Sequence, residues 1–202
     1  MPLNQLVFVR DGESVHHVTG MTGGWTNFPL TDPGLRQAQA TAGHLATFAK
    51  GWPVSSSDLS RAAETAAAIG QSLANTPVHE PLLRENNNGA ATGLSAEAAQ
   101  AIAKPAPLQF APDWTAFGDG ESYAVIADRM SRALARIEAQ AANRAVGVRH
   151  GFSGALLIKA WLGITGATGL SLRLEPASLS EMCINEWGER QLTRLNATFG
   201  SN

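Results

Sequence analysis

Several sequence features are scarce or missing in this chain, and each absence narrows its class. Cys183 is the single cysteine among 202 residues, so neither an internal disulfide nor a cysteine metal cluster can form. No apolar run approaches the roughly 18 residues that a membrane-spanning helix needs. The residues before the short apolar run 6–9 lack the basic start of a secretory signal. We therefore expect a cytoplasmic protein with no membrane partner.

Charge is also low. Charged residues make up 16% of the chain and the formal net charge is −2, so we expect no nucleic-acid partner. Lysine is rare, because only Lys50, Lys104 and Lys159 contribute to the 15 basic residues and the rest are arginines. The planar guanidinium suits bidentate phosphate binding, but such a bias is more often only a matter of genomic composition. Composition therefore excludes some partners without identifying a ligand.

Short apolar segments alternate with alanine-rich helical segments. Strands are predicted at 6–9, 54–57, 78–83 and 145–148, with a closing hairpin at 180–187 and 191–195. Helices are predicted at 33–49, 59–73, 121–142 and 151–161, with a weaker one at 96–103. Thr31 and Asp58 are the expected N-caps of the first two helices. The alternation and length predict one α/β domain, residues 1–202, with a mainly parallel sheet.

Polar clusters follow four of the predicted strands. Any one of them alone would be ordinary loop polarity, but ligands of open α/β sheets bind at the carboxyl ends of the strands. We therefore expect the clusters to share one site. They are Arg10-Asp11-Gly12-Glu13-Ser14, the segment 57–66 with Arg61, the pair Arg84-Glu85, and His150-Gly151.

The ordered set of motifs resembles the histidine phosphatase (phosphoglycerate mutase-like) superfamily. The set consists of R-x-G-E-S, S-S-D-L-x-R-A-x-x-T-A, L-x-E, G-E-S and strand–H-G, and it spans about residues 6–157. The resemblance implies a three-layer sandwich with 86–118 as a lid or insert that shapes specificity. The chain departs from the family at the central position, because Asp11 stands where the family has its nucleophilic histidine.

The resemblance implies roles for the residues at matching positions. Arg10 and Arg61 would clamp the phosphoryl oxygens, and His150 would be a further donor to them. Gly151 would let the following helix start close by, so that its amides also face the anion. Glu85 would protonate the leaving oxygen and then activate water.

Asp11 changes the expected chemistry at the centre of this site. At about 4 Å and an effective dielectric near 20, each pair of like unit charges costs about 4 kcal/mol, so a carboxylate repels a phosphate dianion. Arg10 and Arg61 could pair with Asp11 and so fill the phosphate site with the protein's own carboxylate. Losing the nucleophile of a concerted site can cost a factor of about 10⁶ in rate. We expect impaired turnover, and no metal or cofactor.

Residues around this centre have less specific expectations. His17 stands where mutase-type members usually have asparagine, and His16 and His17 are expected on a loop, lining the pocket or exposed. Trp25 is a candidate for the substrate mouth. Basic residues at helical spacing usually form a solvated face, which is the expectation for Arg129, Arg132 and Arg136.

Three functions remain open from the sequence. The first is a phosphatase of small phosphorylated metabolites, impaired by Asp11 as a natural or engineered change. The second is a non-catalytic phosphate-binding protein. The third is a repurposed enzyme that uses Asp11 and Glu85 as base or nucleophile on a substrate other than a phosphoester. A mutase is less favoured because the stretch 86–89 adds no cations. The small, apolar lid favours a substrate with an uncharged or apolar body, and a homodimer is left open.

Overall fold

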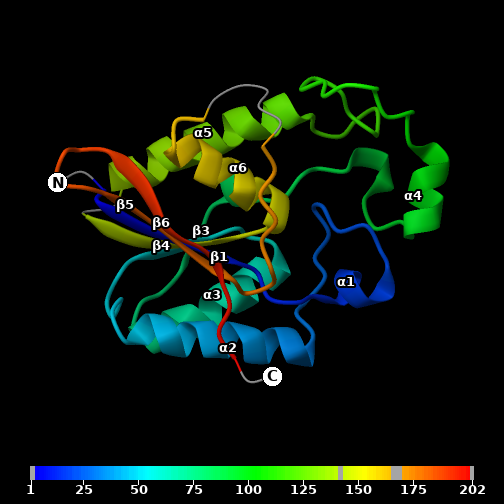
Figure 1. Cartoon of the computed structure of the whole chain (residues 1–202). Helices are drawn as coiled ribbons and strands as arrows, with labels where there is room; N and C mark the ends of the chain where they lie inside the picture. Colours follow the sequence, from blue (N-terminus) through cyan, green and yellow to red (C-terminus); the bar gives the residue numbers. More distant parts are fainter. Residues whose placement is uncertain (1–2, 141–142, 165–169, 201–202) are drawn as a thin grey trace.

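A mixed sheet forms the centre of the molecule, with helices on both faces (Figure 1). The computed structural model describes residues 3–140, 143–164 and 170–200. Within these ranges the strand order is β3-β2-β4-β1-β5-β6, in which β5 and β6 are antiparallel and the other four strands are parallel. The strands are β1 (Gln5–Arg10), β2 (Val54–Ser56), β3 (Val78–His79), β4 (Arg144–Arg149), β5 (Leu179–Ile184) and β6 (Arg190–Ala197).

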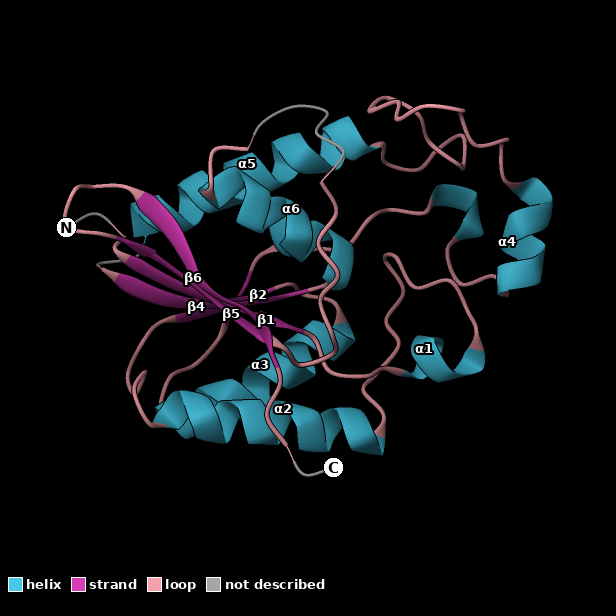
Figure 2. Ribbon diagram, viewed as in Figure 1, coloured by secondary structure: helices cyan, strands magenta, loops and turns pink. Residues whose placement is uncertain are grey.

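The helices are α1 (Val15–Thr19), α2 (Asp32–Ala46), α3 (Ser60–Leu73), α4 (Ala96–Ile102), α5 (Tyr123–Gln140) and α6 (Gly151–Trp161). Four of the helices pack in two layers, α5 and α6 on one face of the sheet and α2 and α3 on the other, while α1 and α4 lie beyond the end of the sheet, as Figure 2 shows. Alternate residues of β1 serve the two cores: Leu6 and Phe8 belong to the cluster with α5 and α6, and Val7 and Val9 to the cluster with α2 and α3. Both faces of the strand are buried, which explains its continuous apolar run. The expected three-layer α/β fold is confirmed.

Two expected N-caps have different outcomes. The Thr31 hydroxyl accepts the Gly34 amide at 3.0 Å and caps α2, as predicted. Asp58 does not cap α3, whose N-cap residue is Leu59. Its carboxylate instead binds Arg84, with 2.7 Å between Oδ1 and the arginine Nε. A bidentate charged pair is stronger than a hydrogen bond to a neutral amide, which explains why Asp58 binds Arg84 instead of capping the helix.

The predicted strand 78–83 is wrong beyond its first two residues. Strand β3 ends at His79, and Pro81–Leu83 forms a 3₁₀ turn. Pro81 has no amide hydrogen for a sheet, and the Glu80 carboxylate caps the turn by accepting the Leu82 amide. The other predicted elements are present with shifted ends. The final residues of the predicted helix 121–142, 141 and 142, lie outside the described residues.

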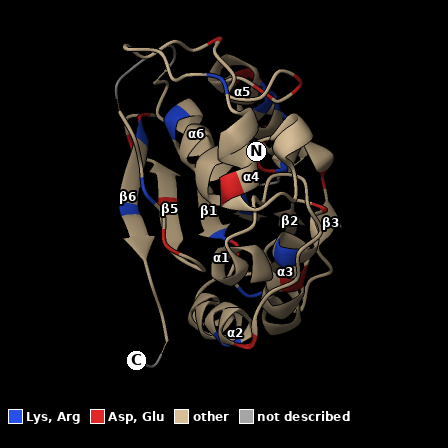
Figure 3. Ribbon diagram, turned by 90° about the vertical axis from the view of Figure 1, so that its right-hand side faces the viewer, with Lys and Arg blue, Asp and Glu red and all other residues tan. Residues whose placement is uncertain are grey.

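Helices α1 and α4 lie beyond the carboxyl end of β1 and face the viewer in Figure 3. The segment expected to be a loop around His16 and His17 is the helix α1. The α1 end is tied to the start of α4, because the Ala96 amide donates to the Gly20 carbonyl at 3.0 Å and the Thr22 amide to the Leu94 carbonyl at 2.8 Å. The 86–118 segment is therefore anchored on the side where the polar clusters meet. No described helix could cross a membrane, judged by its length and apolar content.

The glycine at the contact between α6 and β1 gives a test of this packing. A Cβ at Gly154 would lie 2.2 Å from Cζ of the fully buried Phe8, so Gly154→Ala should cost about 1–3 kcal/mol of unfolding free energy. Gly43 on α2 is the matched control, because a Cβ there meets no atom within 4 Å. Gly43→Ala should stabilise by about 0.5–1 kcal/mol. Urea denaturation of both variants measures the contrast, and equal effects would contradict this packing.

Candidate active site

The carboxyl ends of β1 and β4 bring Asp11 and His150 together. Arg10 and Arg149 are partners in the strand register, and the Asp11 amide donates to the Arg149 carbonyl at 2.6 Å. Oδ2 of Asp11 lies 3.2 Å from Nδ1 of His150 and 2.9 Å from Nε of Arg61. The carboxylate is only 2% exposed. Asp11 is thus a buried anion that contacts two predicted phosphate-binding side chains.

These neighbours decide the ionisation of Asp11. Burial by itself would raise the pKa of this carboxyl above its ordinary value of 3.8. The adjacent His150 and then the guanidinium groups of Arg61 and Arg10 outweigh burial and hold the pKa of Asp11 far below that value. Asp11 is therefore ionised at neutral pH, and the site contains its own anion.

Loop carbonyls hold the guanidinium of Arg61 from the opposite side. Nη1 donates to the Thr26 carbonyl at 2.9 Å and Nη2 to the Gly24 carbonyl at 2.8 Å. Gly24 has a φ of +59°, and a Cβ there would lie 2.9 Å from Nδ2 of Asn88, so this turn requires glycine. The loop after α1 thereby fixes an arginine that is 1% exposed. No motif in the sequence indicated these backbone acceptors.

Arg10 reaches along the start of α6. Its Nη1 donates to the Leu174 carbonyl, and its Nη2 lies 2.9 Å from Nε2 of His17. Its Nε is buried, lies 3.9 Å from Oδ1 of Asp11, and has no hydrogen-bond partner among the described residues. A Cβ at Gly151 would lie 3.3 Å from this Nε. Glycine at position 151 thus leaves room for the guanidinium beside the helix.

His17 lies on the short helix α1 and has two potential hydrogen-bond donors, one at each ring nitrogen. The Ser14 amide donates to its Nδ1 at 3.1 Å, while Arg10 approaches its Nε2. Partial burial and then the positive charge of Arg10 lower the pKa of His17. A neutral imidazole has only one acceptor nitrogen, so it can accept from only one of the two donors at a time. Burial, then His17 and Arg61, lower the pKa of the neighbouring His16 to about 3.

Glu85 lies at the start of α6 rather than free in the pocket. Its Oε2 accepts the Phe152 amide at 3.0 Å and its Oε1 accepts the Ser153 amide at 2.9 Å. The sequence predicted that amides of this helix would face the bound anion. That expectation is wrong for these two amides, because Glu85 takes the anion's place at the positive end of the helix.

Arg129 corrects the expectation of a solvated helix face. It is 8% exposed and donates to both carboxylate oxygens of Glu121, at 2.8 and 2.7 Å. It also donates to the carbonyls of Leu82, Arg84 and Glu85. Arg129 therefore fixes the backbone that carries Glu85. The G-E-S motif at Gly120–Ser122 contained the missing signal, because it supplies the carboxylate that binds Arg129.

The other two arginines of the predicted solvated face, Arg132 and Arg136, are more exposed, with side-chain exposures of 66% and 55%.

Trp25 supports the same backbone from the other side. Its indole Nε1 donates to the Glu85 carbonyl at 2.7 Å. The guanidinium of Arg84 lies over its ring, 4.9 Å from the centroid. The indole is thus engaged next to Glu85, and a part in the substrate mouth stays a prediction.

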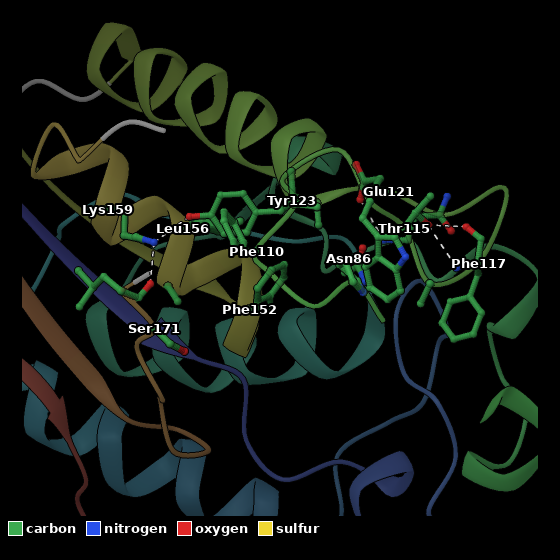
Figure 4. A pocket seen from close by; sticks show the side chains of 18 of the residues that line it. Asn86, Phe110, Thr115, Phe117, Glu121, Tyr123, Phe152, Leu156, Lys159 and Ser171 are labelled. Carbon is green, nitrogen blue, oxygen red and sulfur yellow. Dashed lines mark hydrogen bonds between the residues drawn. The ribbon is translucent and has the colours of Figure 1, made fainter. Parts of the chain in front are cut away.

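A cavity of about 560 Å³ lies next to the backbone that carries Glu85, since Asn86 and Phe152 line it and Glu85 itself does not (Figure 4). Phe152, whose amide binds Glu85, is one of its walls, and the predicted lid supplies Phe110, Trp114 and Phe117. The residues of the Asp11 cluster are not part of its lining. The described ranges hold no group of three or more histidine, cysteine or acidic side chains placed to bind a metal ion.

Neutralising Asp11 tests whether the buried charge is paired. Asp11→Asn should lower the unfolding free energy at pH 7 by about 3–5 kcal/mol, because it leaves buried cationic partners uncompensated. The pKa of Asp11 is depressed in the folded state, so its stabilising effect is lost as pH falls below about 4. Urea denaturation at pH 7 and at pH 3 should therefore show the difference between the two proteins shrinking in acid.

Asp128→Asn is the control. It removes an ion pair with Arg132 whose side chains are 66% and 70% exposed, so it should change the unfolding free energy by under about 1 kcal/mol. A constant Asp11→Asn effect across this pH range would contradict the pairing.

Comparison with known proteins identifies the family of this chain. A probable phosphoglycerate mutase from Yersinia pestis is 29% identical over 185 residues, which cover 90% of this chain and 86% of the relative. A mycobacterial glucosyl-3-phosphoglycerate phosphatase, solved in complex with VO3, superposes with a TM-score of 0.82 at 28% identity and covers 96% of this chain and 99% of its own. The α-ribazole phosphatase of Shigella flexneri shares the fold, with a TM-score of 0.80 at 24% identity over 98% of this chain and 99% of its own. The model of the histidine phosphatase superfamily (branch 1) matches residues 6–198, and the chain belongs to that superfamily.

Proposed function

We propose that this protein carries a phosphatase-type pocket for small phosphorylated metabolites in which Asp11 impairs the chemical step. The observation that carries the proposal is the buried contact of Asp11 with Arg61 and His150 at the carboxyl ends of β1 and β4. Superfamily relatives are named as phosphatases or mutases, which supports phosphoester chemistry in general.

Two unused polar atoms favour a phosphoryl group as the ligand. Nε of Arg10 and Nε2 of His150 are buried and, among the described residues, have no hydrogen-bond partner. Buried polar atoms without partners are rare and usually have a functional reason. A phosphoryl oxygen could accept from Arg10 there. The unpartnered Nε2 of His150 offers a second polar contact to the same group.

Histidine at position 11 would complete the reaction. Its imidazole would attack phosphorus, and the ester oxygen would leave with a proton from Glu85. Glu85 would then accept a proton from the water that cleaves the phosphohistidine. Arg129 and Trp25 hold the Glu85 backbone in place for both steps. Asp11 cannot approach a phosphate dianion in the same way, because both groups are negative.

The alternatives are weaker on physical grounds. A repurposed enzyme would need Asp11 as a base or nucleophile, but its strongly lowered pKa makes it a poor base. A mutase remains less favoured, since the residues after Glu85 are asparagines rather than cations. A phosphate-binding protein without turnover stays the second candidate, because the anion-binding side chains are all present.

Restoring histidine is the direct test of the phosphatase proposal. Asp11→His should hydrolyse p-nitrophenyl phosphate without added metal at least about 10³-fold faster than the unaltered protein. Asp11→Asn is the matched control, because it removes the charge without supplying a nucleophile and should stay inactive. Arg61→Ala in the histidine background should abolish the gain.

Binding of inorganic phosphate separates the two candidate functions. If Asp11→His and Asp11→Asn bind phosphate in calorimetry but neither hydrolyses any of a panel of metabolite phosphates, the protein is a phosphate-binding one. If neither variant binds phosphate or turns over a phosphoester, the proposal is wrong.

A further inference from the structure

Lys159 is a buried cation at one side of the cavity beside Glu85. Its side chain is 3% exposed and lines the cavity from α6. Its Nζ donates to the hydroxyl of Tyr123 and to the carbonyl of Leu170, both at 2.7 Å (Figure 4). Both acceptors are neutral, and an ammonium group has a third hydrogen to donate.

No carboxylate of the described residues neutralises this cation. The ion pairs within these ranges do not include Lys159, and Glu121 is the acidic residue in the lining of this cavity. Asp128, which lines a smaller pocket with Lys159, pairs with Arg132 instead. Glu121 is already bound through both oxygens to Arg129. Burying an unpaired charge is costly, so the lysine is most easily explained by an anion that enters with the ligand.

The positions along α6 relate this cation to the phosphoryl end of the site. Phe152, Ala155, Leu156 and Lys159 all line the cavity, and their spacing places them on one face of the helix. The amide of Phe152 binds Glu85. Lys159 follows seven residues later, which corresponds to about 10 Å along the helix axis. The wall between the two ends is apolar and aromatic.

We propose that this cavity binds a ligand with an apolar or aromatic body and a carboxylate that pairs with Lys159. Resting on the proposed function, this makes the substrate a phosphomonoester that carries a carboxylate at the other end of an apolar body. Tyr123 is a positioning residue, since its hydroxyl holds the ammonium at the cavity wall. The phosphoryl end is then selected by Arg10 and Arg61, and the opposite end by Lys159.

Binding to the unaltered protein tests the carboxylate site without any turnover. The probe is 4-phenylbutanoate, and 4-phenylbutanamide is the neutral comparison. The acid should bind at least about tenfold more tightly in calorimetry, and added salt should reduce this preference. Lys159→Met keeps an unbranched side chain in the cavity and should bring the ratio of the two affinities near one. Lys50→Met, at an exposed lysine, should leave the ratio unchanged. Equal affinity of the unaltered protein for acid and amide would overturn the proposal, whether or not the variant folds.

Activity of the Asp11→His protein supplies a second readout. We expect kcat/KM for the phosphate ester of 8-hydroxyoctanoate to exceed that for octyl phosphate at least about tenfold, and Lys159→Met to remove this ratio. Hydrolysis of p-nitrophenyl phosphate with no preference for the acid would leave the proposed function standing and refute the carboxylate site. Lys159-dependent binding of the acid without any phosphatase activity would support the carboxylate site and refute the proposed function.

Discussion

The buried contact between Asp11, Arg61 and His150 is the constraint on which the site depends. A carboxylate at this depth is tolerated only because cationic and hydrogen-bonding partners surround it. The parallel register of β1 and β4 brings the aspartate and histidine together, and the start of α3 supplies the arginine. The same groups that would bind a phosphoryl dianion therefore hold the protein's own anion, so these cationic side chains have a negatively charged partner without a ligand.

A second set of contacts places the proton-transfer candidate. Glu85 binds amides at the start of α6, while Arg129 and Trp25 hold its carbonyl from either side. Its position thus depends on the contact between α5 and α6 rather than on the sheet alone. The cavity with Lys159 lies along the same helix. One helix therefore links the two ends of the proposed ligand site.

Much of the fold and the central cluster could be predicted from the sequence, because both follow from local patterns. The apolar run of β1 and the order of the motifs were sufficient to identify the layers and to bring Asp11 near Arg61. Predictions from the sequence were wrong where a side chain made a different interaction from the one that its position in the chain suggested. Asp58 binds Arg84 instead of capping α3, and Arg129 is buried by a carboxylate that periodicity does not reveal. Carbonyl acceptors such as that of Gly24 depend on loop geometry, which residue identity does not encode.

The hold of the Gly24 and Thr26 carbonyls on Arg61 has an evolutionary consequence. These contacts come from the main chain, so they do not depend on which side chain occupies position 11. Aspartate and histidine codons differ only in their first base. Under the proposed function, a lineage carrying this sequence keeps the anion-binding framework without its nucleophile, and a single base change returns the nucleophile to a framework that is already assembled.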